Sequence, residues 1–185
     1  LPYIRQFHNK IVVIKYGGSI LREEKIRKGV LEDIVFMNFM GLRPVLVHGG
    51  GPNISDRMRQ SGKKTDFVDG MRVTDEQTLQ VVEEELKKLN DLIVAEIRDL
   101  GAKAMGLNGK ENELVQVEKK KAKIDLGLVG HITGINTAPI LKAAEEDQVV
   151  VLLPMGGGKD GKTYNVNADE TAANVAEALN AEKLV

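Results

Sequence analysis

The chain has 185 residues, of which 42% are apolar and 29% charged, and its formal net charge is -1. This length and balance are typical of a single globular domain with its own hydrophobic core. The near-neutral charge and an aromatic content of 4% without Trp argue against a nucleic-acid-binding surface. The absence of Cys excludes disulfides, Cys-based zinc sites and thiol nucleophiles.

Targeting and membrane signals are missing from the sequence. No apolar run approaches the ~18 residues of a membrane span, and residues 1–10 lack the long apolar region of a signal peptide. We therefore expect a cytoplasmic protein without a membrane partner. The sequence has no initiator Met, and residues 181–185 enter an apolar run as it stops, so we expect a piece of a longer polypeptide.

The first part of the chain predicts strands alternating with helices. The expected elements are a strand at 11–16, a helix at 23–40, a strand at 43–48 and a helix at 53–61. Helical spacing in the first helix predicts a buried stripe made of Ile26, Val30, Ile34 and Met37. Both strands run into glycine-rich turns, Gly17-Gly18 and Gly49-Gly50-Gly51.

The clearest helix follows at 75–100. Thr74 and Gln77 fit a capping box at its start, and Gly101 ends it. One apolar stripe runs along it, formed by Leu79, Val82, Leu86, Leu89, Ile93, Ile97 and Leu100. This stripe is interpreted either as core or as a face for a twofold partner.

The rest of the chain continues the alternation. The expected elements are strands at 102–107, 113–119 and 149–155, helices at 139–146 and 169–180, and a strand beginning within 182–185. The whole pattern predicts an α/β fold, a three-layer αβα sandwich with a mostly parallel central sheet. Ligands in such folds bind beyond the carboxyl ends of the strands, where the two glycine turns and a third cluster, 156–158, are expected.

Two glycine turns are candidate binding sites. Lys15 beside Gly17-Gly18 brings an ammonium and exposed backbone N–H groups together, which suits a phosphate; a strand-end Lys with a tight turn explains the motif equally well. The turn 48–52 (HGGGP) lets a ligand approach the backbone closely. It has neither Rossmann nor P-loop spacing, but three glycines favour binding over a plain turn.

Polar residues near two helix starts are further candidates. Arg72 precedes a helix N-terminus and suits a carboxylate, although by itself it is better explained as a solvated surface residue. Asn165, Asn167 and Asp169 alternate and can share one face. Two Asn amides there could hydrogen-bond the amide and carboxylate of a ligand, whereas Asp169 alone is more simply a helix N-cap.

Residues 156–163 (GGGKDGKT) fit the P-loop pattern. A P-loop needs a helix to begin at its Lys-Thr, but 163–167 alternates like a strand. No later apolar strand ends in a Walker-B Asp. A flexible hairpin is therefore the preferred prediction.

Five segments occur together in the order typical of one family: 11–19 (IVVIKYGGS), 44–55 (PVLVHGGGPNIS), 67–79 (FVDGMRVTDEQTL), 127–136 (GLVGHITGIN) and 164–173 (YNVNADETAA). They resemble N-acetylglutamate kinases of the amino acid kinase superfamily, and the resemblance covers essentially the whole chain. The KxGGS and HGGG motifs are shared across the superfamily. The Gly-x-Arg-Val-Thr and Asn-Val-Asn-Ala-Asp segments are more specific.

The resemblance implies an arginine-biosynthesis enzyme that moves the γ-phosphoryl of ATP to the side-chain carboxylate of N-acetyl-L-glutamate, with Mg²⁺ arriving on ATP. Residues 1–185 would form a single N-terminal acetylglutamate-binding domain, and the C-terminal ATP-binding domain would be absent. One alternative is a binding module for N-acetylglutamate without catalysis. The other is a sister kinase for glutamate, aspartate or an aminoadipate derivative.

The resemblance also implies roles at the phosphoryl end of the site. Lys15 would contact the transferring group, and Gly17 and Gly18 would offer N–H groups to phosphate oxygens. Asp169 would orient Lys15. The helix at 75–100 could pack against a twofold partner, as in family dimers, so we expect a homodimer. The start of the chain resembles the end of a helix that links dimers into hexamers in arginine-inhibited members; most of that helix is absent here, so a hexamer is possible only for the full-length protein.

At the substrate end, the resemblance places Gly49 and Gly50 near the reacting carboxylate. Arg72 would bind the α-carboxylate, and Asn165 and Asn167 would hold the acetamido acid.

Overall fold

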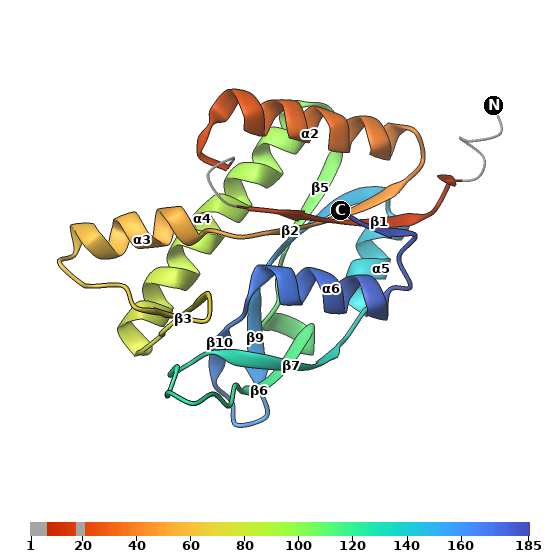
Figure 1. Cartoon of the computed structure of the whole chain (residues 1–185). Coiled ribbons are helices and arrows are strands. Elements are labelled where there is room, and N and C mark those ends of the chain that lie inside the picture. The colour runs from red at the N-terminus through yellow and green to blue at the C-terminus, as the bar shows by residue number, and fades with distance from the viewer. Residues whose placement is uncertain (1–6, 18–20) are drawn as a thin grey trace.

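A five-stranded parallel sheet forms the centre of the computed structural model, which describes residues 7–17 and 21–185 (Figure 1). The strand order is β11-β1-β2-β8-β5, and each neighbouring pair is parallel. The strands are β1 (Ile11–Tyr16), β2 (Arg43–His48), β5 (Lys103–Asn108), β8 (Gln148–Leu153) and β11 (Lys183–Leu184). The three central strands are runs of Val, Ile and Leu because both of their faces are covered.

Helices cover the two faces of this sheet. They are α2 (Glu24–Phe39), α3 (Gly51–Gln60), α4 (Glu76–Asp99), α5 (Ala138–Glu145) and α6 (Ala168–Ala178). α2 and α4 share one hydrophobic cluster with the sheet, and α5 and α6 share a second cluster on the other face. α3 packs on α4 in a third cluster. The predicted αβα sandwich with a mostly parallel central sheet is confirmed.

A second, mixed sheet extends the face that α5 and α6 cover, with the order β10-β9-β6-β7. The remaining elements are β3 (Phe67–Val68), β4 (Met71–Arg72), the 3-10 turn η2 (Glu111–Glu113), β6 (Val115–Lys119), β7 (Gly130–Ile135), β9 (Met155–Gly158) and β10 (Thr163–Asn165). The run 149–155, expected as one strand, is divided at Pro154 between β8 and β9. Proline lacks a backbone N–H, which suits a point where the chain changes sheets.

The P-loop alternative at 156–163 is excluded by the fold. β9 and β10 pair antiparallel as a hairpin, and Gly161 at its tip has φ of +77°. The next helix, α6, begins only at Ala168. Gly156 packs tightly, because a Cβ there would overlap the Val117 side chain. The third glycine cluster therefore serves sheet packing.

Three of the four residues in the predicted α2 stripe pack into the core: Ile34 is buried, and Val30 and Met37 are partly buried against the same cluster. Ile26 is 43% exposed, whereas the buried side chains are Arg27, Leu31, Ile34 and Val35. Arg27 is buried because its guanidinium forms a two-pronged pair with Glu96 of α4, at 2.7 and 2.8 Å. An apolar pattern cannot place a charged residue inside, so the prediction placed Ile26 in the core, where the structure buries its neighbour Arg27.

Two helix starts also differ from the prediction. The N-cap of α4 is Asp75, whose carboxylate accepts from the Thr78 N–H at 2.8 Å, rather than Thr74. The Thr74 hydroxyl instead donates to the Arg72 carbonyl at 2.7 Å. α3 begins at Gly51, with Pro52 in its first turn, and not at residue 53.

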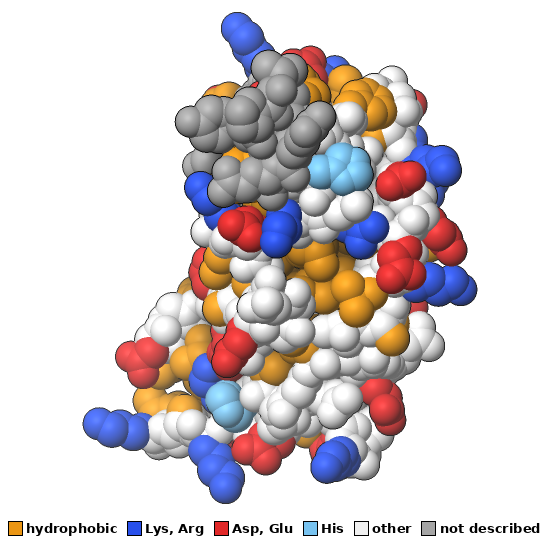
Figure 2. All heavy atoms as spheres, turned by 90° about the vertical axis from the view of Figure 1, so that its right-hand side faces the viewer, with side chains coloured by type: hydrophobic (Ala, Val, Ile, Leu, Met, Phe, Trp, Pro, Cys, Tyr) orange, Lys and Arg blue, Asp and Glu red, His pale blue; other side chains and the backbone are white. Residues whose placement is uncertain are grey.

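The long stripe of α4 is core. Its middle residues are buried against the central sheet or α3, namely Val82, Leu86, Leu89, Ile93 and Ile97. On the face shown in Figure 2, Lys and Arg side chains alternate with Asp and Glu around small apolar areas. Among the described residues no helix is long and apolar enough to cross a bilayer.

Candidate functional site

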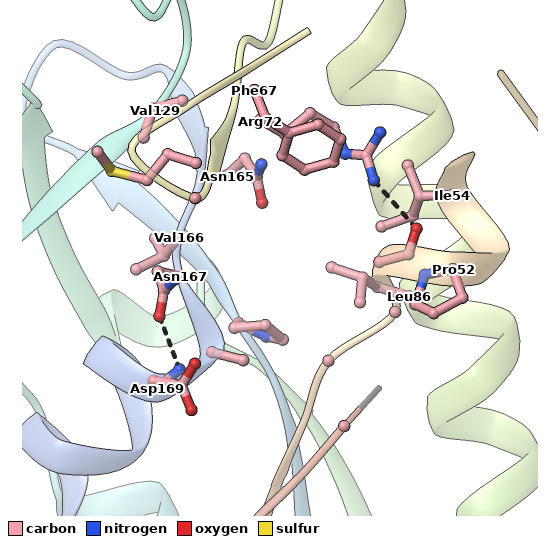
Figure 3. Close-up of a pocket in the computed structure, with 18 of the residues that line it drawn as sticks. Pro52, Ile54, Phe67, Arg72, Leu86, Val129, Asn165, Val166, Asn167 and Asp169 are labelled. Atoms are coloured by element: carbon pink, nitrogen blue, oxygen red, sulfur yellow. Dashed lines mark hydrogen bonds between the residues drawn. The ribbon is translucent and has the colours of Figure 1, made fainter. Parts of the chain in front are cut away.

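A cavity of about 270 Å³ lies beyond the carboxyl ends of β1 and β2 (Figure 3). Its lining includes eight of the predicted site residues: Lys15, Gly17, Gly49, Gly50, Arg72, Asn165, Asn167 and Asp169. The ninth, Gly18, lies outside the described residues. The volume is just below the range of about 300–1,000 Å³ found for drug-sized ligands, so a small metabolite suits the cavity.

One end of the cavity carries an ion pair. Lys15 Nζ lies 3.0 Å from Asp169 Oδ1, with side chains 33% and 71% exposed. A Cβ on Gly17 would lie only 3.2 Å from Lys15 Nζ, so a glycine at this position avoids crowding the ammonium group. The N-cap interpretation of Asp169 is wrong, because Asn167 caps α6 by accepting from the N–H groups of Asp169 and Glu170. Asp169 is therefore left to hold Lys15.

The turn after β2 offers backbone donors. The Gly49 N–H is used, since it donates to the Tyr16 carbonyl at 2.8 Å. Within the described part of the chain, the N–H groups of Gly50 and Gly51 have no hydrogen-bond partner. They stand at the N-terminus of α3, where unpaired N–H groups and the helix dipole favour an anion.

Arg72 is buried, with only 6% of the residue exposed, so its interpretation as a solvated surface residue is wrong. Nη2 donates to the Gly51 carbonyl at 3.0 Å and to Ser55 Oγ at 2.9 Å. The guanidinium lies 4.7 Å from the centre of the Phe67 ring. Nη1 is buried without a partner among the described residues, which also offer this Arg no carboxylate.

Burial of Arg72 lowers its pKa, because desolvation penalises the charged form. A guanidinium keeps its proton even so, since its ordinary pKa is above ~12. A buried cation that lacks an anionic partner is energetically unfavourable. A carboxylate entering the cavity would complete the site, and Figure 3 shows Arg72 across the cavity from Asp169.

The two asparagines present complementary groups. The Thr74 hydroxyl donates to a carbonyl, so it accepts from Asn165 Nδ2 at 3.3 Å and leaves Asn165 Oδ1 as an acceptor. Asn167 uses its Oδ1 in capping α6, which leaves its NH₂ group as a donor. One acceptor and one donor match the N–H and C=O of an acylamino group.

The remaining lining is mostly apolar, and apart from Gly51 and Pro52 of the glycine turn the sequence did not single it out as part of a site. It comprises Pro52, Ile54, Phe67, Met71, Leu86, Val129, Pro154 and Val166, with Gly51, Gly70 and Ala168. Phe67 belongs to the β3–β4 hairpin, whose loop residues Asp69 and Gly70 have φ of +49° and +76°. An Asp-Gly pair between short apolar stretches predicts such a turn, so this signal was available.

In the described part of the chain, no group of three or more His, Asp or Glu residues converges to hold a metal ion. The polar groups in the cavity are Asn amides, backbone N–H groups, two cationic side chains and one carboxylate, Asp169, which is paired with Lys15. This set suits anionic and amide oxygens better than a bare cation.

The sequence profile of the amino acid kinase family matches residues 10–185. This chain belongs to the amino acid kinase family. An acetylglutamate kinase of Caldanaerobacter subterraneus subsp. tengcongensis is 48% identical over 186 residues, covering 100% of this chain and 62% of that protein. One from Bordetella petrii is 46% identical over 195 residues, covering 100% of this chain and 65% of that protein. This family member thus spans less than two thirds of these relatives.

Solved structures share the fold of this amino acid kinase family member. A Streptococcus mutans UA159 protein matches with a TM-score of 0.86 and 31% identity, over 94% of this chain and 70% of that one. The N-acetylglutamate synthase of Neisseria gonorrhoeae, complexed with coenzyme A and N-acetylglutamate, matches with a TM-score of 0.85 and 25% identity, over 99% of this chain and 42% of that one. A Giardia carbamate kinase matches with a TM-score of 0.65 at 14% identity, which supports the fold alone.

Proposed function

We propose that this chain forms the N-acetyl-L-glutamate site of an acetylglutamate kinase that acts in arginine biosynthesis with ATP and Mg²⁺. The observation that carries the proposal is the buried Arg72, which has no carboxylate partner in the described part of the chain and faces the Lys15–Asp169 pair across one cavity. A substrate with a carboxylate at each end suits two cationic groups so arranged. The names of the similar proteins support the same ligand.

In this proposal the α-carboxylate pairs with Arg72. The acetamido N–H donates to Asn165 Oδ1, and Asn167 Nδ2 donates to a substrate oxygen, as their hydrogen bonds allow. The side-chain carboxylate then lies near the N–H groups of Gly50 and Gly51. L-Glutamate would offer an ammonium where the acylated amino acid offers a neutral N–H, so the acetylated ligand is favoured.

In the proposed reaction, the bond between the γ-phosphorus of ATP and its bridging oxygen breaks. A bond between that phosphorus and the side-chain carboxylate oxygen forms, giving an acyl phosphate and ADP. The carboxylate is already ionised at pH 7, so no general base is needed. Lys15, oriented by Asp169, and the backbone donors stabilise charge on the transferring group, and catalysis is mostly positioning and electrostatics.

A second candidate is a module that binds N-acetyl-L-glutamate without catalysis. It is favoured by the match covering only 62–65% of the relatives' length, since we propose that most of the ATP site lies in the part not spanned here. A sister kinase for glutamate, aspartate or an aminoadipate derivative fits Asn165 and Asn167 less well. A homodimer stays a prediction.

Thermal unfolding with ligand tests the binding proposal. N-acetyl-L-glutamate at 100 times its Kd should stabilise the folded chain by about 2.7 kcal/mol, or roughly 5 °C or more in Tm at this size. L-Glutamate and N-acetyl-L-alanine, which lacks the second carboxylate, are matched controls. Equal shifts with all three ligands, or none with any, would contradict the proposal.

Catalysis is tested separately by adding MgATP and trapping acyl phosphate with hydroxylamine. Hydroxamate that requires both substrates and is lost in Lys15→Met would assign phosphoryl transfer to this chain. Binding without hydroxamate would favour the module.

A further inference from the structure

His48, at the end of β2, is fully buried beside the cavity and has no role in the site as described so far. Its two ring nitrogens both have partners. Nε2 lies 3.0 Å from Asn90 Nδ2, and Nδ1 lies 3.1 Å from the Gly49 carbonyl oxygen. The imidazole therefore links the middle of α4 to the glycine turn.

The partners of His48 determine its tautomer. Asn90 Nδ2 also lies 2.9 Å from the Val151 carbonyl, which can only accept, so Nδ2 is the amide nitrogen and donates to both groups. Nε2 of His48 must then accept. The Gly49 carbonyl can likewise only accept, so Nδ1 carries the hydrogen and donates to it. Burial lowers the pKa of His48 to about 4, which keeps the ring neutral near pH 7.

The close packing around Asn90 supports a specific role for its hydrogen bond to His48. Asn90 is 4% exposed on α4, and a Cβ on Gly106 of β5 would overlap Asn90 Oδ1. The glycine within β5 thus admits the amide that holds His48. A glycine inside a strand often marks such a close approach.

The hydrogen bond to Gly49 fixes the direction of the next N–H group. The described peptides are all trans, so the Gly49 carbonyl and the Gly50 N–H point to opposite sides of one peptide plane. Because His48 holds the carbonyl from the interior, the Gly50 N–H points away from the interior, and Gly50 lines the cavity. This N–H has no partner in the described part of the chain.

We propose that His48 is a positioning residue: through its Nδ1–H bond to the Gly49 carbonyl it presents the Gly50 N–H to an anionic oxygen of the bound ligand. A glycine turn without this clamp can rotate the peptide and offer the carbonyl, which repels a carboxylate. Preorganised donors of this kind stabilise negative charge at no reorganisation cost. The inference depends on the proposed function only for the name of the ligand.

Amide and imidazole NMR of the wild-type chain gives the first test. The ring correlations of His48 should show the Nδ1–H tautomer at pH 7. The Gly50 amide proton should move downfield with acetate, a minimal carboxylate, and with N-acetyl-L-glutamate. An Nε2–H tautomer, or a Gly50 amide that neither ligand moves, would overturn the proposal without any variant having to fold.

Two substitutions separate positioning from packing. His48→Asn places an amide N–H near the position of Nδ1, whereas His48→Leu fills the space without a donor. The Leu variant should bind N-acetyl-L-glutamate about 10- to 100-fold more weakly and lose the Gly50 shift, and the Asn variant should retain most of both. Equal affinity in wild type and His48→Leu, or equal loss in both variants, would refute the positioning role.

The two proposals fail differently. If acetate moves the Gly50 amide but N-acetyl-L-glutamate binds no more tightly than acetate, the ligand is wrong and the role of His48 stands. If N-acetyl-L-glutamate binds tightly while the Gly50 amide stays unmoved, the ligand stands and the role of His48 is wrong.

Discussion

Arg72→Met separates a ligand-binding arginine from a structural one. Met keeps most of the length and apolar volume of the side chain but removes the charge and every donor. We expect affinity for N-acetyl-L-glutamate to fall strongly while the free energy of unfolding of the empty chain changes little. A structural arginine would give the reverse result.

The magnitudes follow from the contacts of Arg72. A hydrogen-bonded pair with a ligand carboxylate contributes about 1.5–3 kcal/mol, which corresponds to a Kd raised about 10- to 150-fold. In the empty chain the substitution removes two bonds to the neutral acceptors Gly51 O and Ser55 Oγ, about 1 kcal/mol each. It also removes the desolvation cost of a buried charge without a carboxylate partner in the described residues, so the two effects offset to within about 1 kcal/mol.

Calorimetric titration measures the first quantity and urea unfolding the second. Ser55→Ala is the matched control, because it removes one neutral contact of Arg72 and leaves the charge; it should weaken binding less than tenfold. A loss of 3 kcal/mol or more in unfolding free energy for Arg72→Met, with the folded protein binding as wild type does, would refute the reasoning.

Three further predictions concern the supporting structure. Gly50→Ala should lower the unfolding free energy by about 1–3 kcal/mol, because its Cβ would lie 2.8 Å from Leu86 Cδ2; in urea unfolding, Leu86→Ala should relieve part of this cost, and strict additivity would contradict the contact. His48 binds its proton less well folded than unfolded, so unfolding free energy should fall from pH 6.5 towards pH 4 by up to about 3 kcal/mol. In His48→Leu the unfolding free energy should no longer fall over this pH range. An unchanged fall in the variant would mean that another group causes it. Arg27→Met leaves Glu96, 14% exposed, without its partner and should cost about 3–5 kcal/mol, measured by urea unfolding; a cost below 1 kcal/mol would mean that water replaces the pair.

The order of strands and helices was largely predictable, because continuous apolar runs and helical spacing reflect burial on both faces of a sheet. β7 was missed, and its sequence explains why. Gly130 and Gly134 interrupt a short run that also contains His131, so its strand signal is weak and its pairing with β6 is a tertiary effect.

Arg27 and Arg72 are buried, and apolar patterning could not predict this. Arg27 is buried only because Glu96, distant in sequence, meets it across α2 and α4. Arg72 is buried because Ser55 and the Phe67 ring surround it. Periodicity treats a charged residue as exposed, and only the partners reveal the exception.

Motifs combined with a family resemblance selected the candidate site residues, and eight of them line one cavity, but the role proposed for each depends on its hydrogen bonds. Asn167, expected to contact ligand, also caps α6, and this leaves Asp169 to hold Lys15. The Gly49 N–H donates to the Tyr16 carbonyl, so among the described residues of this turn the N–H groups of Gly50 and Gly51 remain available to a ligand. Such divisions depend on where neighbouring backbone groups point, which a sequence does not record.

Calorimetric titration of this 185-residue chain with N-acetyl-L-glutamate, with L-glutamate as the control, tests the central claim most directly. The proposal predicts saturable binding of the acetylated ligand at one site per chain and much weaker binding of L-glutamate. Absence of binding by a chain that circular dichroism shows to be folded, or equal affinity for both ligands, would contradict it.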